Sequence, residues 1–271
     1  MSLNVRALGE GPPVLLLHGF TGSARTWDDL IDAWSSGHRC IAPDLLGHGG
    51  SEAPVDPARY ALERQAAELA ELLRLLDAVP ATLVGYSMGA RLALVLALEH
   101  PAQVQRLILE SPSAGIADGV ARAERRVRDE ALARDLEQGG LEAFVDRWEA
   151  QPLFASHASM PRGRRQRLRA ERLRHDAAGM AASLRGAGQG AMRPLHDRLG
   201  HIDVPTLVIA GERDGMGRER ASVVVAAIPG ARLEVVPGAG HTPHLEDPEA
   251  FLRLADAFLR PADPMLHHLS H

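Results

Sequence analysis

The stretch that decides the fold is ATLVGYSMGARLAL, residues 81–94. An apolar, strand-like run, Ala81–Gly85, meets an apolar helical pattern at a Gly-x-Ser-x-Gly pentapeptide centred on Ser87. A serine on so tight a strand-to-helix turn needs small residues on both sides, so that strand and helix can approach each other. Its hydroxyl then projects above the sheet, beside the positive dipole end of the helix. This context predicts that Ser87 is a catalytic residue.

On both sides of this turn, apolar strand-like runs alternate with helical patterns. The strand-like runs are Val14–Leu17, Arg39–Asp44, Val104–Glu110, Val204–Ala210 and Leu233–Val236. Apolar residues at helical spacing occur in Tyr60–Leu76, Met88–His100 and Pro248–Leu259. Strands that alternate with helices predict an α/β fold, with a mostly parallel sheet flanked by helices on both faces.

The alternation stops between about residues 114 and 199. This stretch is helical in pattern, which predicts a helical cap, residues 114–199, inserted into a core made of residues 1–113 and 200–271. The predicted cap holds 16 arginines against 12 acidic residues, a net charge of +4, whereas the rest of the chain has a net charge of −9. The chain contains no lysine. A codon bias of the source would account for the use of arginine instead of lysine. It would not account for the net positive charge of residues 114–199.

Composition excludes several classes of protein. The 271 residues, 45% of them hydrophobic, suit a globular domain with a sizeable core. No apolar run approaches the roughly 20 residues of a membrane span, and no signal peptide is apparent. The single cysteine, Cys40, excludes an internal disulfide and favours a cytoplasmic location. The net charge of −5 argues against a nucleic-acid partner.

A glycine-rich loop and a histidine-rich tail could suggest ligand binding, but neither fits. The loop DLLGHGGS, residues 44–51, lacks the lysine of a phosphate-binding loop. We expect it to be a shaped loop with Asp44 or Ser51 in hydrogen bonds nearby. Metal-binding motifs are missing, and the histidines of residues 267–271 are typical of a solvated chain end. We therefore expect no metal and no cofactor.

A histidine that could serve Ser87 follows the last strand-like run. His241 ends the sequence GAGH, residues 238–241, and the glycines around it favour a loop that can reach the serine. His244 is the alternative, only three residues further on. We prefer His241 because it follows the strand directly.

A carboxylate that could orient this histidine follows the strand before. Asp214 ends the sequence GERD, residues 211–214, past the end of a strand, where loops gather over the site. A buried carboxylate holds the histidine tautomer and stabilises its charged form in a catalytic triad. Glu212 and Asp203 are the alternatives to Asp214.

Negative charge that develops during such a reaction needs hydrogen-bond donors. The sequence HGFTG, residues 18–22, directly follows the first strand-like run and places a backbone N–H opposite the serine. We expect the N–H groups of Phe20 and Met88 to form an oxyanion hole. His18 itself is either part of this site or purely structural.

In this order, HGFTG, DLLGHGGS, GYSMG, GERD and GAGH resemble the motifs of the α/β-hydrolase superfamily. The resemblance covers the whole chain and implies the α/β-hydrolase fold, with a triad in the order Ser87, Asp214, His241. This fold hosts esterases, lipases, C–C bond hydrolases and lyases, so the motifs do not determine the reaction.

A narrower resemblance rests on Arg91 and on the segments LESP, AERR and FVDRWEAQPLFAS, residues 109–112, 123–126 and 144–156. This combination is similar to the 2-succinyl-6-hydroxy-2,4-cyclohexadiene-1-carboxylate (SHCHC) synthase family of menaquinone (vitamin K2) biosynthesis. Members are lyases that eliminate pyruvate from an enolpyruvyl cyclohexene carboxylate precursor. The substrate-binding residues that this resemblance implies are Tyr86, Arg91, Arg125, Trp148, Phe154 and Arg174.

Two departures from the family pattern stand close to the predicted triad. Ala90 replaces a usual glycine, which is a mild change. Met216 and Gly217 replace a Lys-Phe pair that often follows the aspartate, at the place of one possible polar contact of the family.

The charge distribution agrees with a small anionic carboxylate substrate. Arginine binds carboxylates through two parallel hydrogen bonds and keeps its charge. A net-positive cap over a net-negative core would steer such an anion to the site, although most cap arginines are expected to lie on solvated helix faces.

Three functions remain open from the sequence. In the lyase reading, His241 activates Ser87 to remove a ring proton as a base. In a carboxylesterase or C–C bond hydrolase, Ser87 would instead be a nucleophile. A non-catalytic binding module is the third alternative, and the complete triad argues against it.

Overall fold

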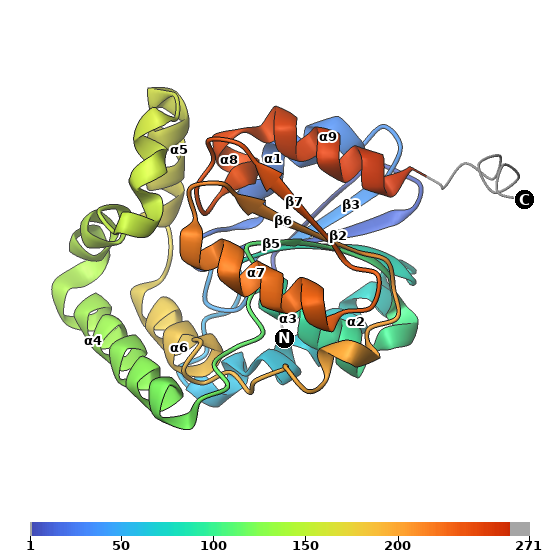
Figure 1. Cartoon of the computed structure of the whole chain (residues 1–271). Helices are drawn as coiled ribbons and strands as arrows, with labels where there is room; N and C mark the ends of the chain where they lie inside the picture. Colours follow the sequence, from blue (N-terminus) through green and yellow to red (C-terminus); the bar gives the residue numbers. More distant parts are fainter. Residues whose placement is uncertain (1, 261–271) are drawn as a thin grey trace, which may run out of the picture.

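A computed structural model describes residues 2–260, so the predicted solvated tail at residues 267–271 lies outside the described residues. One seven-stranded sheet crosses the described part of the chain, in the order β1-β3-β2-β4-β5-β6-β7 (Figure 1). Only β1 pairs antiparallel, with β3, and the other neighbours are parallel. The strands are β1 (Val5–Leu8), β2 (Pro13–Leu17), β3 (Arg39–Pro43), β4 (Ala81–Tyr86), β5 (Val104–Glu110), β6 (Thr206–Gly211) and β7 (Arg232–Val236). The predicted α/β class and mostly parallel sheet are confirmed, and β1 is an addition.

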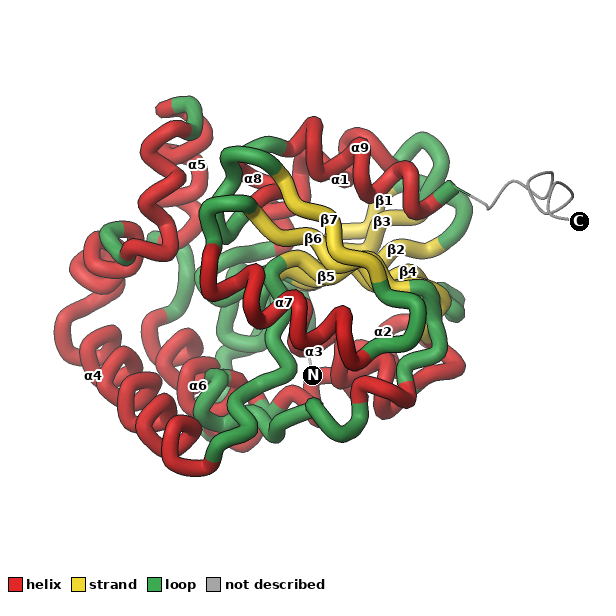
Figure 2. The backbone as a smooth tube through the Cα atoms, viewed as in Figure 1, coloured by secondary structure: helices red, strands yellow, loops and turns green. Residues whose placement is uncertain are grey.

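Helices cover both faces of this sheet (Figure 2). They are α1 (Asp28–Trp34), α2 (Leu62–Leu75), α3 (Met88–Glu99), α7 (Gly215–Ala227), α8 (Pro243–Glu246) and α9 (Pro248–Leu259). Short 3-10 turns are η1 (Ala24–Trp27), η2 (Pro57–Tyr60), η3 (Pro101–Gln103) and η5 (Leu199–His201). The expected helices around α2, α3 and α9 are present, whereas α1, α7 and α8 were not predicted.

Successive residues of each central strand point into two different core layers, as the pleat of a strand requires. In β2, Leu15 and Leu17 pack with α2, α3 and α7, whereas Val14 and Leu16 pack with α1 and α9. All four side chains are fully buried. A strand buried on both faces is apolar at every position, which is why β2 is an unbroken apolar run in the sequence.

A separate group of helices connects β5 to β6. It consists of α4 (Gly119–Glu149), η4 (Pro152–Ser159), α5 (Arg162–Arg172) and α6 (Ala177–Ala187), and α4 bends at Gly140, whose φ is 78°. Helices α4 and α6 share a small apolar core of their own, with Phe144 and Met180 fully buried. Phe20, from the loop after β2, reaches this core. The group therefore lies against the loops that follow the parallel strands (Figure 1).

No helix among residues 2–260 is both long enough and apolar enough to cross a membrane.

Candidate active site

Ser87 occupies a backbone conformation that side chains rarely adopt, with φ 50° and ψ −101°. Its neighbours two residues away must be glycine. A Cβ on Gly85 would lie 2.5 Å from the carbonyl oxygen of Gly89, and one on Gly89 would lie 2.0 Å from the carbonyl oxygen of Leu17. The Ser87 N–H donates to the carbonyl of Glu110, 2.9 Å away on β5. The glycines therefore let β4, α3 and the neighbouring strand meet closely enough to expose the serine hydroxyl.

A chain of polar contacts runs from Asp214 through His241 to Ser87. His241 Nδ1 lies 2.5 Å from Asp214 Oδ2, and its Nε2 lies 3.3 Å from Ser87 Oγ. Asp214 also accepts a hydrogen bond of 2.9 Å from the N–H of Gly217, in the first turn of α7. Burial alone would raise the pKa of Asp214, but hydrogen bonding to His241, the charge of His241 and the Gly217 N–H together lower it. The carboxylate is therefore ionised and holds the imidazole in place.

The alternatives considered from the sequence lie elsewhere. Glu212 is exposed and accepts the N–H of Gly238, and Asp203 is exposed as well. His244 is fully buried, with its Nδ1 2.6 Å from Glu110 Oε2, behind the site. Of these candidates, the structure therefore brings only Asp214 and His241 to Ser87.

The loop that carries His241 is fixed at several points. Ser111 Oγ donates to the carbonyl of His241 over 3.1 Å. The Glu246 carboxylate accepts the N–H of Gly240 at 2.7 Å and both the N–H and the hydroxyl of Thr242. Neither Ser111 nor Glu246 was singled out from the sequence, because each becomes relevant only when β5 and α8 meet this loop.

The two residues predicted to supply the oxyanion hole line the same cavity. Phe20 and Met88 line the cavity above Ser87, and neither backbone N–H has an acceptor in the hydrogen bonds of the described residues. Met88 is the first residue of α3, where backbone N–H groups have no partner within the helix. Both groups are thus available to a developing oxyanion.

His18 has a structural position. Its Nδ1 lies 2.8 Å from the carbonyl of Gly19, and its Nε2 accepts the N–H of Leu45 at 2.9 Å. Burial lowers the pKa of His18 to about 4, so the ring is neutral. It joins the loop after β2 to the loop after β3 and takes no place beside Ser87.

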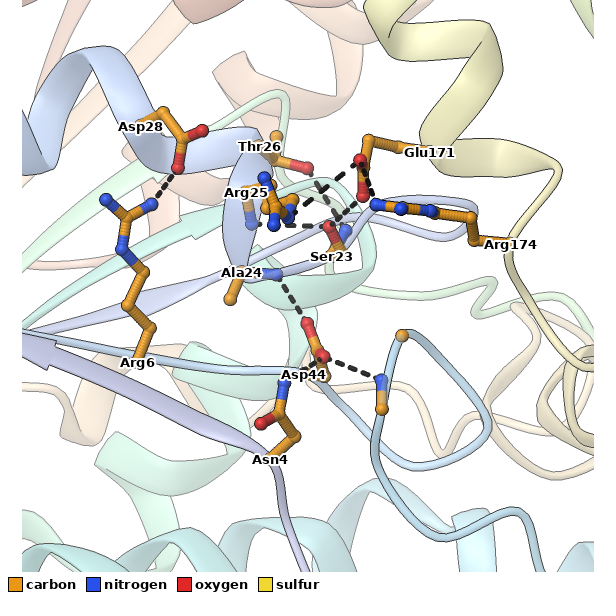
Figure 3. A network of polar contacts seen from close by, with 12 residues as sticks. Asn4, Arg6, Ser23, Ala24, Arg25, Thr26, Asp28, Asp44, Glu171 and Arg174 are labelled. Atoms are coloured by element: carbon orange, nitrogen blue, oxygen red, sulfur yellow. Dashed lines mark hydrogen bonds and ion pairs between the residues drawn. The ribbon is translucent and has the colours of Figure 1, made fainter.

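The loop at residues 44–51 is held by hydrogen bonds, as its sequence suggests. Asp44 accepts the N–H groups of Ala24 at 2.7 Å and Gly50 at 2.8 Å, and the amide of Asn4 at 2.7 Å (Figure 3). Ser51 Oγ donates to the carbonyl of Asp44 over 2.6 Å. This loop shapes the fold beside the site.

A cavity of about 440 Å³ opens above Ser87 and His241. Its walls are formed by residues around Ser87 and by residues of α4 and η4, which lie between β5 and β6 in the chain. Five of the six predicted substrate-binding residues line it: Tyr86, Arg91, Arg125, Trp148 and Phe154.

The arginines of this cavity differ in their partners. Arg91 is 6% exposed and donates to the carbonyl of Ala187 over 2.7 Å, with no ion-pair partner among the described residues. Burial, then the positive charge of Arg125, lowers the pKa of Arg91 to about 10, so its guanidinium remains charged at neutral pH. Arg125 pairs with Asp129 at 2.7 Å. The cavity therefore presents positive charge that its own carboxylates only partly neutralise.

Arg174 is a correction to the sequence analysis. Its side chain is 66% exposed and pairs with Glu171 at 3.3 Å, in a surface network beside Arg25 and Ser23 (Figure 3). Helix α5 ends at Arg172, and the turn that follows directs Arg174 away from the cavity. The family resemblance implied a role for Arg174, but a short surface turn does not determine from sequence which of its residues faces the cavity.

Arg220 and Arg128 are charged cavity residues that sequence reasoning missed. Arg220 lies on α7 and lines the cavity together with Met216 and Gly217. A Cβ on Gly217 would lie 1.9 Å from Asp214 Oδ2, which explains why glycine stands at this position. The missing lysine of the family pattern pointed to this stretch, but not to the arginine four residues after Met216.

Comparison with known proteins agrees with this geometry. The model of the α/β hydrolase fold family matches residues 12–248, and the chain belongs to that family. Within it, the chain belongs to the SHCHC synthase family. It is 42% identical to a Bacillus subtilis (strain 168) protein provisionally named as this synthase, over 92% of both chains. It is 32% identical to the SHCHC synthase of Salmonella paratyphi C, covering 88% of this chain and 89% of the relative. The structure of MenH from S. aureus superposes with a TM-score of 0.90 and 34% identity, over 94% of this chain and 97% of that one.

Proposed function

We propose that this protein is an SHCHC synthase, a lyase that eliminates pyruvate from an enolpyruvyl cyclohexene carboxylate in menaquinone biosynthesis. One observation carries the proposal beyond family membership. The Asp214–His241–Ser87 chain opens into a cavity that also holds Arg91, a buried arginine without a carboxylate partner among the described residues. An esterase for neutral substrates has no use for such a charge, whereas an anionic substrate neutralises it.

In this mechanism, Ser87 acts as a base. His241 accepts the hydroxyl proton of Ser87, while Ser87 Oγ takes a proton from the substrate ring. The electron pair of the broken C–H bond forms a new ring double bond, and the bond between the ring and the enolpyruvyl oxygen breaks. The enolpyruvate that leaves takes up a proton and becomes pyruvate. The N–H groups of Phe20 and Met88 stabilise negative charge on the reacting molecule. Asp214 stabilises the imidazolium that forms on His241.

The remaining residues would bind the substrate. Arg91 and Arg125 hold carboxylates, and Tyr86, Trp148 and Phe154 pack against the ring. No step requires a metal or cofactor.

We further propose that residues 114–199 act as a cap over a core of residues 1–113 and 200–271. The cap supplies Arg125 and Trp148 to the cavity, whereas the core supplies Ser87 and His241. The net charge of +4 on the cap then attracts the anion toward the core. A cytoplasmic location fits the single buried thiol, Cys40.

The test compares two reactions of the same enzyme. The enolpyruvyl precursor is supplied and pyruvate release is followed, while a neutral p-nitrophenyl ester is assayed in parallel. Arg91→Gln is expected to lower kcat/KM for the precursor by about 100-fold, because it removes a charge-assisted contact worth roughly 3 kcal/mol. Ester turnover, which needs no such contact, falls much less. Arg126→Gln is the control, since Arg126 is exposed on α4 outside the cavity.

The hydrolase alternative uses Ser87 as a nucleophile with the same His241 contact. Rapid ester turnover without any pyruvate from the precursor would establish that alternative and eliminate the lyase.

A further inference from the structure

Arg220 is a charged residue on a face of α7 that is otherwise buried, and it lines the cavity. It lies three residues after Gly217 on α7, so the two share one face of the helix. That face also contains Ala221 and Val224, which are buried in the core. Arg220 itself is half-buried and lines the cavity above Ser87. An arginine at the edge of a buried helix face normally has a carboxylate partner or reaches bulk water.

The described residues give Arg220 no such partner. No carboxylate oxygen lies within ion-pair distance of its guanidinium in residues 2–260. Asp214 is near enough to favour the charged form of Arg220, but both of its oxygens are already engaged, by His241 and by the N–H of Gly217. Asp214 therefore attracts Arg220 through space, while its hydrogen bonds are made to His241 and Gly217.

The charges near Arg220 have both signs, because Asp214 and Glu219 favour its charged form whereas Arg125 opposes it. Burial, and then the positive charge of Arg125, lowers the pKa of Arg220, and Arg220 in turn lowers the pKa of Arg91. Four arginines, Arg91, Arg125, Arg128 and Arg220, line this cavity. Arg125 pairs with Asp129 and Arg128 lies 3.9 Å from Glu124, whereas Arg91 and Arg220 have no ion pair within residues 2–260. An anion with more than one negative charge would relieve the mutual repulsion of Arg91, Arg125 and Arg220.

We propose that Arg220 is a substrate-binding residue that receives a second carboxylate of the substrate from the α7 side of the cavity. Arg91 and Arg125 receive the first from α3 and α4. The cavity is then selective for small di- or tricarboxylates over monocarboxylates. A single carboxylate would leave the positive charge on one side of the cavity without a counter-charge. The assignment of this carboxylate to the lyase substrate rests on the proposed function. The preference for dicarboxylates does not.

The first experiment measures pyruvate release by Arg220→Gln, Arg220→Lys and Arg218→Gln. Arg218 is the matched control, because it lies exposed on the same helix and contacts only the carbonyl of Glu212. Arg220→Gln is expected to lower kcat/KM by about 10- to 100-fold, mainly through KM, as loss of one charged hydrogen-bonding partner predicts. Arg220→Lys recovers part of this loss, and Arg218→Gln resembles the wild type.

The second experiment uses binding alone, so that it does not depend on the reaction. Thermal unfolding of each variant is recorded with benzoate and with benzene-1,3-dicarboxylate. The wild type is expected to gain more stability from the dicarboxylate than from benzoate, and Arg220→Gln is expected to lose that difference. Without ligand, Arg220→Gln melts at the same temperature as the wild type or higher, because repulsion with Arg91 and Arg125 is relieved.

The outcomes separate the two proposals. A wild type that releases no pyruvate, yet prefers the dicarboxylate through Arg220, refutes the lyase and supports the role of Arg220. Dicarboxylate preference that survives in Arg220→Gln overturns that role. An equal loss of neutral ester turnover in Arg220→Gln, with a shifted pH profile of kcat, also overturns it, since Arg220 would then act through Asp214.

Discussion

Replacement of Ser87 by glycine is expected to give a more stable protein than replacement by alanine, and both changes should abolish activity. Ser87 has φ 50° and ψ −101°, a conformation in which a side chain is strained and glycine is not. The comparison is with Ser87→Ala, which also removes the hydroxyl but keeps the Cβ. Both variants lose the contact between Ser87 Oγ and His241 Nε2, so their difference isolates the backbone strain.

The magnitude follows from two opposing contributions. A residue held in a sparsely populated backbone region costs about 1–3 kcal/mol in the folded state. Glycine also lowers the free energy of unfolding by about 0.5–1 kcal/mol, because its unfolded chain is more flexible than that of alanine. The glycine variant should therefore be up to about 2.5 kcal/mol more stable than the alanine variant, which corresponds to at most roughly 10 °C in Tm for a chain of this size.

Urea unfolding followed by circular dichroism, together with calorimetry, measures this difference in free energy of unfolding. Both variants should release no pyruvate. A glycine variant that is less stable than the alanine variant would refute the reasoning, since the strain relieved would then be smaller than the cost of glycine's flexibility in the unfolded chain.

Two further predictions concern the acidic residues around the site. Asp214→Asn should lower kcat by about 10³- to 10⁴-fold, because the histidine loses its tautomer control; steady-state pyruvate release checks this, with the exposed Glu212→Gln as control, and a loss below tenfold would contradict it. The pKa values of Asp44 and Glu246 are lowered, since their hydrogen bonds outweigh the opposing effect of burial. Their stabilisation is complete above their unfolded pKa values of about 4 and is lost as the pH falls through the lower folded values. Urea unfolding should thus show little change from these groups between pH 7 and 5 and a decline below about pH 4, and a decline that begins at pH 6 would speak against this source.

The sequence predicted the central strands well, because burial on both faces leaves an unbroken apolar run. The expected strand Val104–Glu110 matches β5 at both ends. Strand β1, Val5–Leu8, was missed because it lies at the sheet edge, where its residues are half-buried or exposed. Helix α7 was missed because Gly215 and Gly217 interrupt its first turn, and glycine is a poor helix former.

The candidate site divides in the same way. Ser87, Asp214 and His241 each follow a strand, so the topology of a parallel sheet brings them to one edge. Arg220 and Glu246 carry no local signal, because their positions depend on how α7 and α8 approach other elements. Contacts within one turn or at one strand end can be predicted from the local sequence, whereas contacts between distant helices become visible only in the folded chain.

Glu110, the last residue of β5, contacts both the serine turn and the segment that follows the histidine loop. Its carbonyl accepts the N–H of Ser87, and its buried carboxylate lies 2.6 Å from His244, three residues after His241. The serine turn and the histidine loop are therefore both tied to the same residue at the end of β5. Changes in α4 to α6 can therefore reshape the cavity while Glu110 still holds the serine turn and the histidine loop. New substrates can then evolve through changes in the helices above the sheet, while the proton-transfer geometry below them is inherited intact.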